Sequence, residues 1–461
     1  MHQLQEQQRT PTPQPIAKTT RKRQVSALRQ FWILSVRNLR IMAQDKVGLA
    51  LMLAVAPLIG LMDFIWGKEL FDVVDGNAAQ VITMLFMMGL IGILTGALSS
   101  VREIVKEVEI YRRERTVTLK LMPYIMSKVW IGLILAAYQA LVFVLAKRFL
   151  VDPVFHGSYG YGAMYLTVFL CTLSGYMLGL LISAAAPNQN IALFLVVIVL
   201  VPQFLFAGAL LPRDLIPGGQ FISAITSTRW AFDGLVRISG IGEDVVNDPC
   251  WQLPDSRRND LTQDDKDDLG CRCMGTQMFE ECYFPGIQSP DFYDQETRQQ
   301  LAEEEPEKPI TPTPYSTLTP YPTLTPYPTL TPPPQPSSPQ DQQAYQELLR
   351  EQGEDYQDLR QAQGDEYTIL RESQGDDYQD LREEQGEEFQ DESEDWGEDL
   401  RDWESQREKA VQGAEGMIDQ IYGDYEPAFE ANVQTSWLAL AIISIVVLGL
   451  TMVFQKRKDV I

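Results

Sequence analysis

The chain has 461 residues, 45% of them hydrophobic, and a formal net charge of −24. The charge is segregated: residues 212–435 carry 50 acidic and 16 basic residues, whereas the rest of the chain carries 12 acidic and 22 basic residues. Every long apolar run lies in the basic part, so a soluble acidic enzyme fits poorly and an integral membrane protein with one large acidic loop is predicted. The acidic loop also argues against nucleic acid as a partner, because its phosphates would be repelled.

The chain opens with a polar, proline-containing segment, residues 1–24, which we predict to be a disordered cytoplasmic tail. In the stretch that follows, up to Gln44, bulky apolar residues alternate with Arg29, Arg37 and Arg40. This pattern predicts an amphipathic helix lying along the inner leaflet, with a short juxtamembrane linker as the alternative.

Six apolar segments have about the 17 to 25 residues needed to cross the hydrocarbon of a bilayer. They are residues 47–66, 81–101, 129–146, 163–186, 191–211 and 437–454. Six crossings place both chain ends on one side, and the basic residues near both ends assign that side to the cytoplasm. The predicted location is therefore the plasma membrane, with Lys147 and Arg148 on the outer side as a local exception to the charge rule.

Small residues recur at a spacing of four in two of these segments, as Gly92 with Gly96 and as Gly175 with Gly179. This spacing lets two helices approach closely. Packing within one subunit is favoured over a contact between two subunits.

A densely charged segment, residues 101–128, separates the second apolar segment from the third. Its basic residues are Arg102, Lys106, Arg112, Arg113, Arg115, Lys120 and Lys128. Short loops this basic, and this close to spanning segments, stay in the cytoplasm.

The loop between the last two crossings is predicted to lie outside the cytoplasm and to have several parts. Residues 212–235 contain short apolar pieces broken by prolines and a glycine pair, which indicates a re-entrant or interfacial element. Residues 241–310 contain four cysteines, Cys250, Cys271, Cys273 and Cys282. In an oxidising space these predict two disulfides with three possible pairings. A four-cysteine metal site is the alternative, but no histidine lies nearby, and no metal is predicted.

Two repeats follow in the acidic loop. In residues 311–340 the unit Y-P-T-L-T-P recurs every six residues and predicts an extended polyproline II stalk. In residues 341–412 an 11-residue period places aromatic residues at Tyr345, Tyr356, Tyr367, Tyr378 and Phe389. Leucine follows three residues after each tyrosine, and a glycine shares the period. This period, 3.67 residues per turn, predicts a helix that either pairs through its Tyr/Leu stripe or stays single and frays at each glycine.

The remaining parts are a linker at 413–436 and the last crossing with its basic end at 437–461. No phosphate-binding G-x-x-x-x-G-K-[ST] loop occurs, and the two histidines stand in no catalytic or metal-binding pattern. We therefore predict that the chain is not an enzyme and binds no cofactor of its own.

The order of these parts resembles the ABC-2-type permeases, particularly the membrane half of the G subfamily of ABC transporters. The resemblance covers roughly residues 25–240, the predicted transmembrane domain, and the final crossing. Glu103, Arg113-Glu114-Arg115, Tyr124 and Lys128 match the family pattern between spans two and three. Ser227, Arg229 and Trp230 match its re-entrant element.

The resemblance implies an all-α polytopic membrane protein with six transmembrane helices, an N-terminal amphipathic helix and a large extracytoplasmic loop. It also implies an exporter subunit, paired with a second permease as a homodimer or heterodimer in the membrane lipid. A separate nucleotide-binding ATPase carrying ATP and Mg²⁺ would power it, and the substrate would be lipid-like or hydrophobic. The alternative is a non-transporting membrane anchor that displays the outer stalk and acidic helix.

The resemblance also implies residues for two roles. Contact with the ATPase would involve Glu103, Arg112, Arg113, Glu114 and Arg115. The pathway between spans two and five would be lined by Met84, Met88, Phe204 and Phe206.

Overall fold

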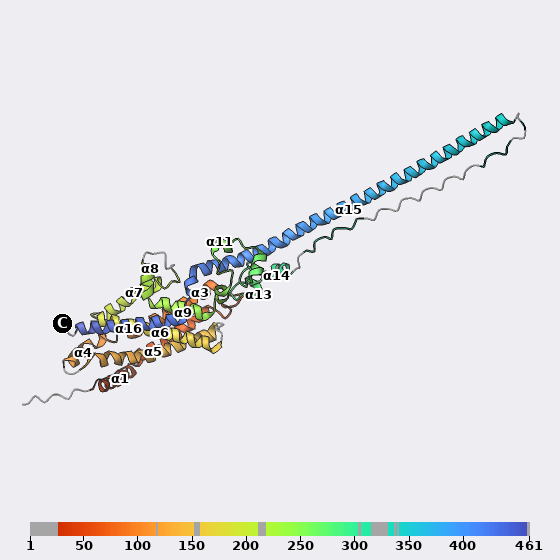
Figure 1. Cartoon of the computed structure of the whole chain (residues 1–461). Coiled ribbons are helices and arrows are strands. Elements are labelled where there is room, and N and C mark those ends of the chain that lie inside the picture. The colour runs from red at the N-terminus through yellow and green to blue at the C-terminus, as the bar shows by residue number, and fades with distance from the viewer. Residues whose placement is uncertain are drawn as a thin grey trace, which may run out of the picture. The chain divides into compact units, whose positions relative to one another are not determined.

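The computed structural model describes residues 26–116, 119–151, 157–210, 218–302, 306–314, 331–335, 338 and 341–458. These residues form helices, turns and loops without a β-strand, in agreement with the predicted all-α class (Figure 1). The chain divides into two compact units, Met1–Gln295 with Ala410–Ile461, and Glu296–Lys409. The predicted cytoplasmic tail, residues 1–24, lies outside the described residues.

The first unit contains the membrane-spanning helices. Within the described residues, five stretches are long and apolar enough to cross a membrane: Lys46–Ile65, Ala78–Arg115, Leu121–Leu150, Tyr159–Ala185 and Val433–Lys458. They contain α2 (Lys46–Leu61) with the 3-10 turn η1 (Met62–Ile65), α3 (Ala78–Ser100), α5 (Leu121–Leu150), α6 (Gly157–Ala185) and α16 (Val433–Lys458). The chain is therefore a multi-pass membrane protein.

The fifth predicted crossing is shorter than the others. It corresponds to α7 (Gln189–Leu205), which has 17 residues. After α8 (Gly219–Ile225), the chain continues in α9 (Ser227–Ser239). The Ser227 hydroxyl lies 2.6 Å from that of Ser174 within α6, so α9 begins inside the bundle and not at its surface. α9 buries Phe232 and Leu235 completely.

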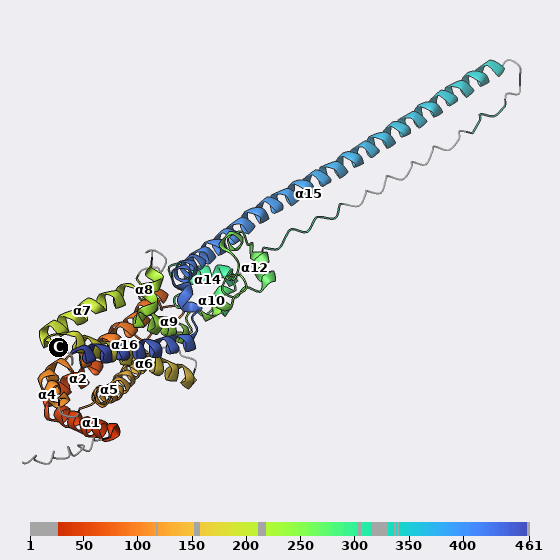
Figure 2. The same ribbon diagram turned by 60° about the vertical axis from the view of Figure 1, so that its left-hand side comes forward.

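Helices α3 and α6 make the most extensive helix contact in the bundle. A methyl group at Gly96 would overlap the backbone of Thr172, and one at Gly175 would overlap the backbone of Ile93. The Ser100 hydroxyl also donates a hydrogen bond of 2.6 Å to the Tyr176 carbonyl. The predicted glycine contact is therefore present within a single subunit. Figures 1 and 2 show α5 and α16 lying alongside α6.

The cysteine-containing region is a cluster of short helices. They are α10 (Glu243–Asn247), α11 (Asp255–Arg258), α12 (Gln263–Leu269) and α13 (Met278–Glu281). The cluster is tied to the loop that follows η1: the Tyr283 hydroxyl donates to the Phe71 carbonyl at 2.8 Å, and the Gln288 amide donates to the Val73 carbonyl at 2.8 Å. We call the end of the bundle that carries this cluster the η1 end.

The second unit contains the residues on either side of the predicted stalk, part of α14 (Gln295–Ala302), and most of α15 (Gln342–Phe429). α15 is one continuous helix that passes through all five repeat glycines without a break. The predicted linker, 413–436, was wrong over most of its length, because α15 continues to Phe429. Ala414, Ile418 and Ile421 recur at helical spacing and are buried in the first unit, which keeps this segment helical.

Candidate functional site

The charged segment after α3 folds into a short helix at the end of the bundle opposite η1. α3 ends at Ser100, and the amides of Ile104 and Val105 both donate at 3.0 Å to the Ser183 hydroxyl on α6. After the 3-10 turn η2 (Val105–Glu107), helix α4 covers Val108–Arg115. Its basic residues lie in the last turn, where they complement the helix dipole. We call this end of the bundle the α4 end.

A buried ion cluster joins the segment that precedes α4 to the start of α5. The Lys128 ammonium, 1% exposed, lies 2.8 Å from the Glu107 carboxylate and 3.3 Å from that of Glu103. Glu103 also pairs with Lys106. Removing charges from water is costly unless they are paired, so two carboxylates and two ammonium groups make a neutral, mutually dependent set.

Aromatic side chains surround this cluster. The rings of Tyr111 and Tyr124 lie 4.7 Å apart, and the Tyr124 hydroxyl lies 3.5 Å from the Glu107 carboxylate. Tyr176 of α6 donates to the Lys128 carbonyl at 3.2 Å. Charge, hydrogen bonds and ring packing therefore fix α4 to α5 and α6 together.

Helix α1 (Ala27–Gln44) is bound to the same elements through its polar face. Arg37 pairs with Glu114 of α4 at 2.7 Å, and Asn38 donates to the Ser127 hydroxyl of α5 at 3.1 Å. The opposite face carries exposed apolar side chains, including Leu28 and Trp32. A helix with its polar side on the protein and its apolar side outward has the form expected of an interfacial helix.

The predicted coupling residues occupy different environments. Glu103 is buried in the ion cluster. Glu114 is bound to Arg37, and Arg115 donates to the Leu119 carbonyl at 2.6 Å. Of the five predicted coupling residues only Arg112 and Arg113 are exposed, and they share α4 with the exposed residues Glu109 and Ile110. The structure thus separates residues that hold the helix in place from residues that can meet a partner.

Two members of this site were missed from the sequence. Arg37 lies 77 residues before its partner Glu114, so no local pattern connects them. Glu107 stands four residues after Glu103, and this spacing places both carboxylates near one cation only once α5 is positioned.

The predicted pathway residues do not come together. Met84 and Met88 line a cavity of about 230 Å³ between η1, α3 and α5, together with Met62, Phe143 and the pair Asp63–Lys147. Phe204 of α7 packs instead on Phe86 of α3, with ring centroids 5.6 Å apart, and it does not line this cavity. Phe206 directly follows α7, and its carbonyl lies 3.4 Å from the Thr226 hydroxyl.

The cavity contains a buried ion pair near the η1 end. The Lys147 ammonium lies 2.6 Å from the Asp63 carboxylate, and both residues are buried. This pairing explains why a lysine occurs on the side of the membrane where positive charge was not expected: its charge is balanced inside the bundle.

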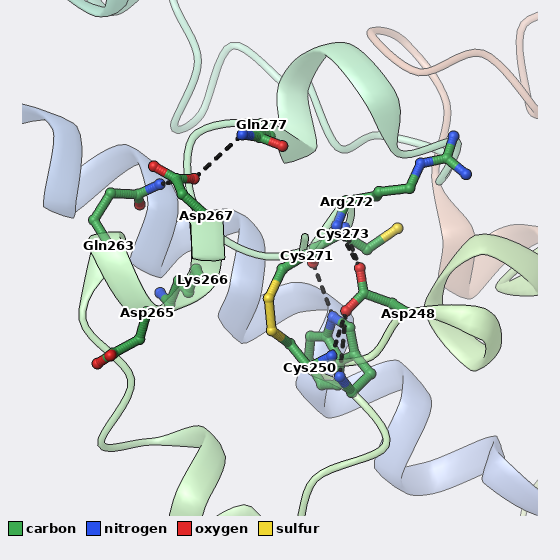
Figure 3. Close-up of a disulfide and its surroundings, with 12 residues drawn as sticks. Asp248, Cys250, Gln263, Asp265, Lys266, Asp267, Cys271, Arg272, Cys273 and Gln277 are labelled. Atoms are coloured by element: carbon green, nitrogen blue, oxygen red, sulfur yellow. Dashed lines mark hydrogen bonds between the residues drawn. A yellow bond between two sulfur atoms is a disulfide. The ribbon is translucent and has the colours of Figure 1, made fainter. Parts of the chain in front are cut away.

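The four loop cysteines form two disulfides, Cys250–Cys271 (Figure 3) and Cys273–Cys282. Asp248 lies beside the first of them. Its carboxylate accepts the amide hydrogens of Cys250 at 2.8 Å, Arg272 at 2.6 Å and Cys273 at 2.7 Å. The Asp248 oxygens and the Cys250 and Cys271 sulfurs lie close enough to hold a metal ion. Because the two sulfurs are bonded to each other and the carboxylate accepts hydrogen bonds from backbone amides, we interpret this group as stabilising the local fold.

Comparison with known proteins agrees with this architecture. Residues 29–238 match the family model of the ABC-2 type transporter. The chain is also similar to the ABC transporter ATP-binding/permease protein Rv1747 of Mycobacterium tuberculosis, with 26% identity over 245 residues. The match covers 48% of this chain and 27% of that relative's length. Residues 29–238, with their apolar helices and charged α4, are therefore similar to the membrane domain of ABC-2 type transporters.

Proposed function

We propose that this chain is the permease subunit of an ATP-driven ABC transporter and that a nucleotide-binding ATPase docks on α4. The observation that carries the proposal is an exposed pair of arginines, Arg112 and Arg113, on a short helix that is fixed to the bundle by a buried ion cluster. Arginines on a rigid support can make charge-assisted contacts with a partner's carboxylates. The family match supports an ATPase partner.

Transmission would follow from the contacts of α4. The Arg37–Glu114 pair links α4 to α1, and the pairing of Lys128 with Glu107 links the segment before α4 to α5. Ser183 holds the turn between α3 and α4 on α6. A push on α4 would therefore move several helices as a body, which is how packed bundles convert a local displacement into a larger one.

The substrate proposed is lipid-like or hydrophobic, and the direction is export. The apolar cavity that Met84 and Met88 line supports an apolar ligand, because flexible methionine side chains adapt to irregular hydrocarbon shapes. A second permease subunit would complete the transporter, with ATP and Mg²⁺ held by the ATPase. Both ends of the chain would lie in the cytoplasm of a plasma-membrane protein, and the cysteine cluster and α15 outside.

The docking step is tested by charge reversal. We expect Arg112→Glu with Arg113→Glu to weaken co-purification of the ATPase about tenfold or more, because charged hydrogen bonds contribute roughly 1.5–3 kcal/mol each. Lys456→Glu with Arg457→Glu is the matched control, since both residues are exposed at the end of α16 and the charge change is equal. If the two variants lose equal amounts of ATPase, or neither loses any, α4 is not the docking surface.

The transmission step needs a different variant. Glu114→Ala with Arg115→Ala removes the contacts to Arg37 and the Leu119 carbonyl without touching the exposed arginines. We expect the ATPase to remain bound while substrate no longer stimulates ATP hydrolysis in the reconstituted complex. Intact stimulation would show that force is not transmitted through these contacts.

A second candidate function is a membrane anchor that displays the second unit. The size of α15, 88 residues, favours it, because a transport cycle needs no helix of that length. The two functions are distinguished by the copurification experiment: an anchor would bring down no ATPase from membranes that contain the assembled wild-type chain.

A further inference from the structure

One face of α15 is partly covered within the second unit, and it repeats every 11 residues. Five residues share the position seven places after each repeat aromatic: Gln352, Gln363, Gln374, Gln385 and Trp396. All are half-buried, as are the repeat aromatics themselves. Seven residues are close to two helical turns, so both sets lie on one face. The predicted Tyr/Leu stripe is therefore better described as a Tyr/Gln face, because Leu348 and Leu359 are exposed.

Three residues of this face contact Pro306, Thr313 and Thr331, which lie in or just before the proline-rich segment of the same chain. Gln352 donates from its side-chain amide to the Thr331 carbonyl at 3.3 Å, and Gln385 donates to the Thr313 carbonyl at 3.0 Å. The Trp396 indole donates to the Pro306 carbonyl at 2.9 Å. The three donors occupy one repeat position, and the three acceptors run in the opposite direction along the chain.

The spacing of these contacts relates the two repeats to each other. Gln352 and Gln385 are 33 residues apart, which is three 11-residue repeats, and Thr313 and Thr331 are 18 residues apart, which is three hexapeptides. A helix rises about 1.5 Å per residue, so the first interval is roughly 50 Å. Polyproline II rises about 3.1 Å per residue, so the second is at most roughly 56 Å. The two intervals are therefore nearly equal in length.

The two periods also agree in rotation. Polyproline II has three residues per turn, so six residues make two whole turns and return the same carbonyl to the same side. Eleven residues make three whole turns of a helix at 3.67 residues per turn. Each 11-residue repeat can thus offer its donor to an equivalent carbonyl of one hexapeptide. Polyproline II leaves its carbonyls without internal partners, so side-chain donors are suitable ligands for them.

We propose that the hexapeptide and 11-residue repeats are matched one to one and that the proline-rich segment is the partner of the Tyr/Gln face. Residues 315–330 lie outside the described residues, and the matching across them is inferred from the equal number of repeats between the contacts at Thr313 and Thr331. The second unit would then be a self-partnered stalk whose length is set by the number of repeat pairs. This proposal is independent of transport. It makes the proline-rich segment of the same chain the partner of the Tyr/Gln face, so a second copy of the chain would not bind there.

The test is a set of repeat deletions in the full chain, reconstituted in nanodiscs. One variant lacks residues 321–326, a second lacks 356–366, and a third lacks both. Hydrogen exchange is measured over residues 385–399, which contain the Gln385 and Trp396 anchors. We expect exchange there to be roughly fivefold faster in each single deletion, the factor that one lost hydrogen bond gives. The double deletion should restore the wild-type rate.

A length-matched control separates register from loop length. Replacing residues 321–326 by six alternating glycine and serine residues keeps the spacing but removes the polyproline preference, and it should accelerate exchange less than the deletion does. The proposal is wrong if the double deletion exchanges as fast as either single one, or if the single deletions match wild type. Protection that depends on protein concentration would also overturn it, because a second copy would then be the partner.

Discussion

At the scale of single residues, Lys128 is the side chain on which the α4 end depends. It is nearly inaccessible to water and lies between the carboxylates of Glu103 and Glu107. Without its ammonium group, Glu103 would keep its pair with Lys106, but Glu107 would lose the cation that lies 2.8 Å away. The cost of that arrangement exceeds the cost of removing any one exposed charge from the same region.

We therefore predict that Lys128→Met lowers the free energy of unfolding by about 3–5 kcal/mol, the range for breaking a buried ion pair from one side. Lys106→Met is the control and should cost at most about 1 kcal/mol, because Lys106 is partly exposed and Glu103 keeps Lys128. Denaturant unfolding of the detergent-solubilised chain measures both. Equal losses would mean that the cluster is not centred on Lys128.

Tyr283 gives a prediction for alkaline pH. Burial raises the pKa of its phenol to about 12, with the nearby Asp72 carboxylate adding to the effect. The unfolded pKa is about 10, so the unfolded state loses this proton first as pH rises. The stability that the neutral phenol contributes is complete below about pH 10 and disappears by about pH 12.

The expected result is that wild type loses stability between these pH values more steeply than Tyr283→Phe, which has no phenol to ionise. Unfolding midpoints measured across this range test it. The substitution should itself cost about 0.5–1.5 kcal/mol near neutral pH, because the hydrogen bond to the Phe71 carbonyl is lost. Parallel pH curves for the two proteins would contradict the assignment.

At the scale of elements, the sequence predicted most helices but misplaced their ends where charges are paired. The third crossing was predicted as 129–146, bounded by Lys128 and Lys147, yet α5 runs from Leu121 to Leu150. Both lysines lie inside the helix because carboxylates from other elements neutralise them. Periodicity identifies an apolar helix, but a partner 84 residues away, as Asp63 is from Lys147, leaves no local signal.

The same limit applies to the candidate site. The run Arg112 to Arg115 was visible as interleaved charge, but its division into exposed and internally bonded residues depends on where α1 and Leu119 lie. The α15 repeat was likewise visible, whereas its Gln352 and Gln385 contacts depend on a segment that returns along the helix. Repeats predict that a face exists, and tertiary contacts decide what covers it.

The contact between α3 and α6 leads to a matched pair of substitutions. Gly96→Ala would place a methyl group against the Thr172 backbone, which cannot move aside, so we expect a loss of about 1–3 kcal/mol or more. Gly92→Ala would meet the Thr172 hydroxyl at 3.3 Å, and its helix-propensity gain of up to about 1 kcal/mol offsets the crowding. Thermal melts of the two variants should therefore differ clearly, and similar melts would place α3 and α6 farther apart.

At the scale of the first unit, independent contacts assign elements to its two ends. The α4 end contains the Arg37–Glu114 pair, the Ser183 contacts and Lys458 of α16, whose ammonium donates to the Ala186 carbonyl at 2.9 Å. The η1 end contains the Asp63–Lys147 pair and the contact of Tyr283 with Phe71. Between them, α5 and α6 each run from one end to the other. The disulfide cluster and α4 should therefore face opposite sides of a membrane.

Labelling with a membrane-impermeant maleimide on intact cells tests this arrangement. Wild type should not react, because four cysteines are paired and Cys171 is buried. Asp268→Cys, exposed on the disulfide cluster, should react at once, whereas Arg113→Cys and Arg457→Cys should react only after the membrane is permeabilised. The comparison of Arg113 with Asp268 tests whether α7 and α9 together cross the bilayer. If they do, three crossings separate the two residues, which then lie on opposite sides. If they do not, two crossings separate them, and both lie on the same side. Reaction of both from the same side would therefore remove the fifth predicted crossing and, with it, the placement of α4 next to a cytoplasmic ATPase.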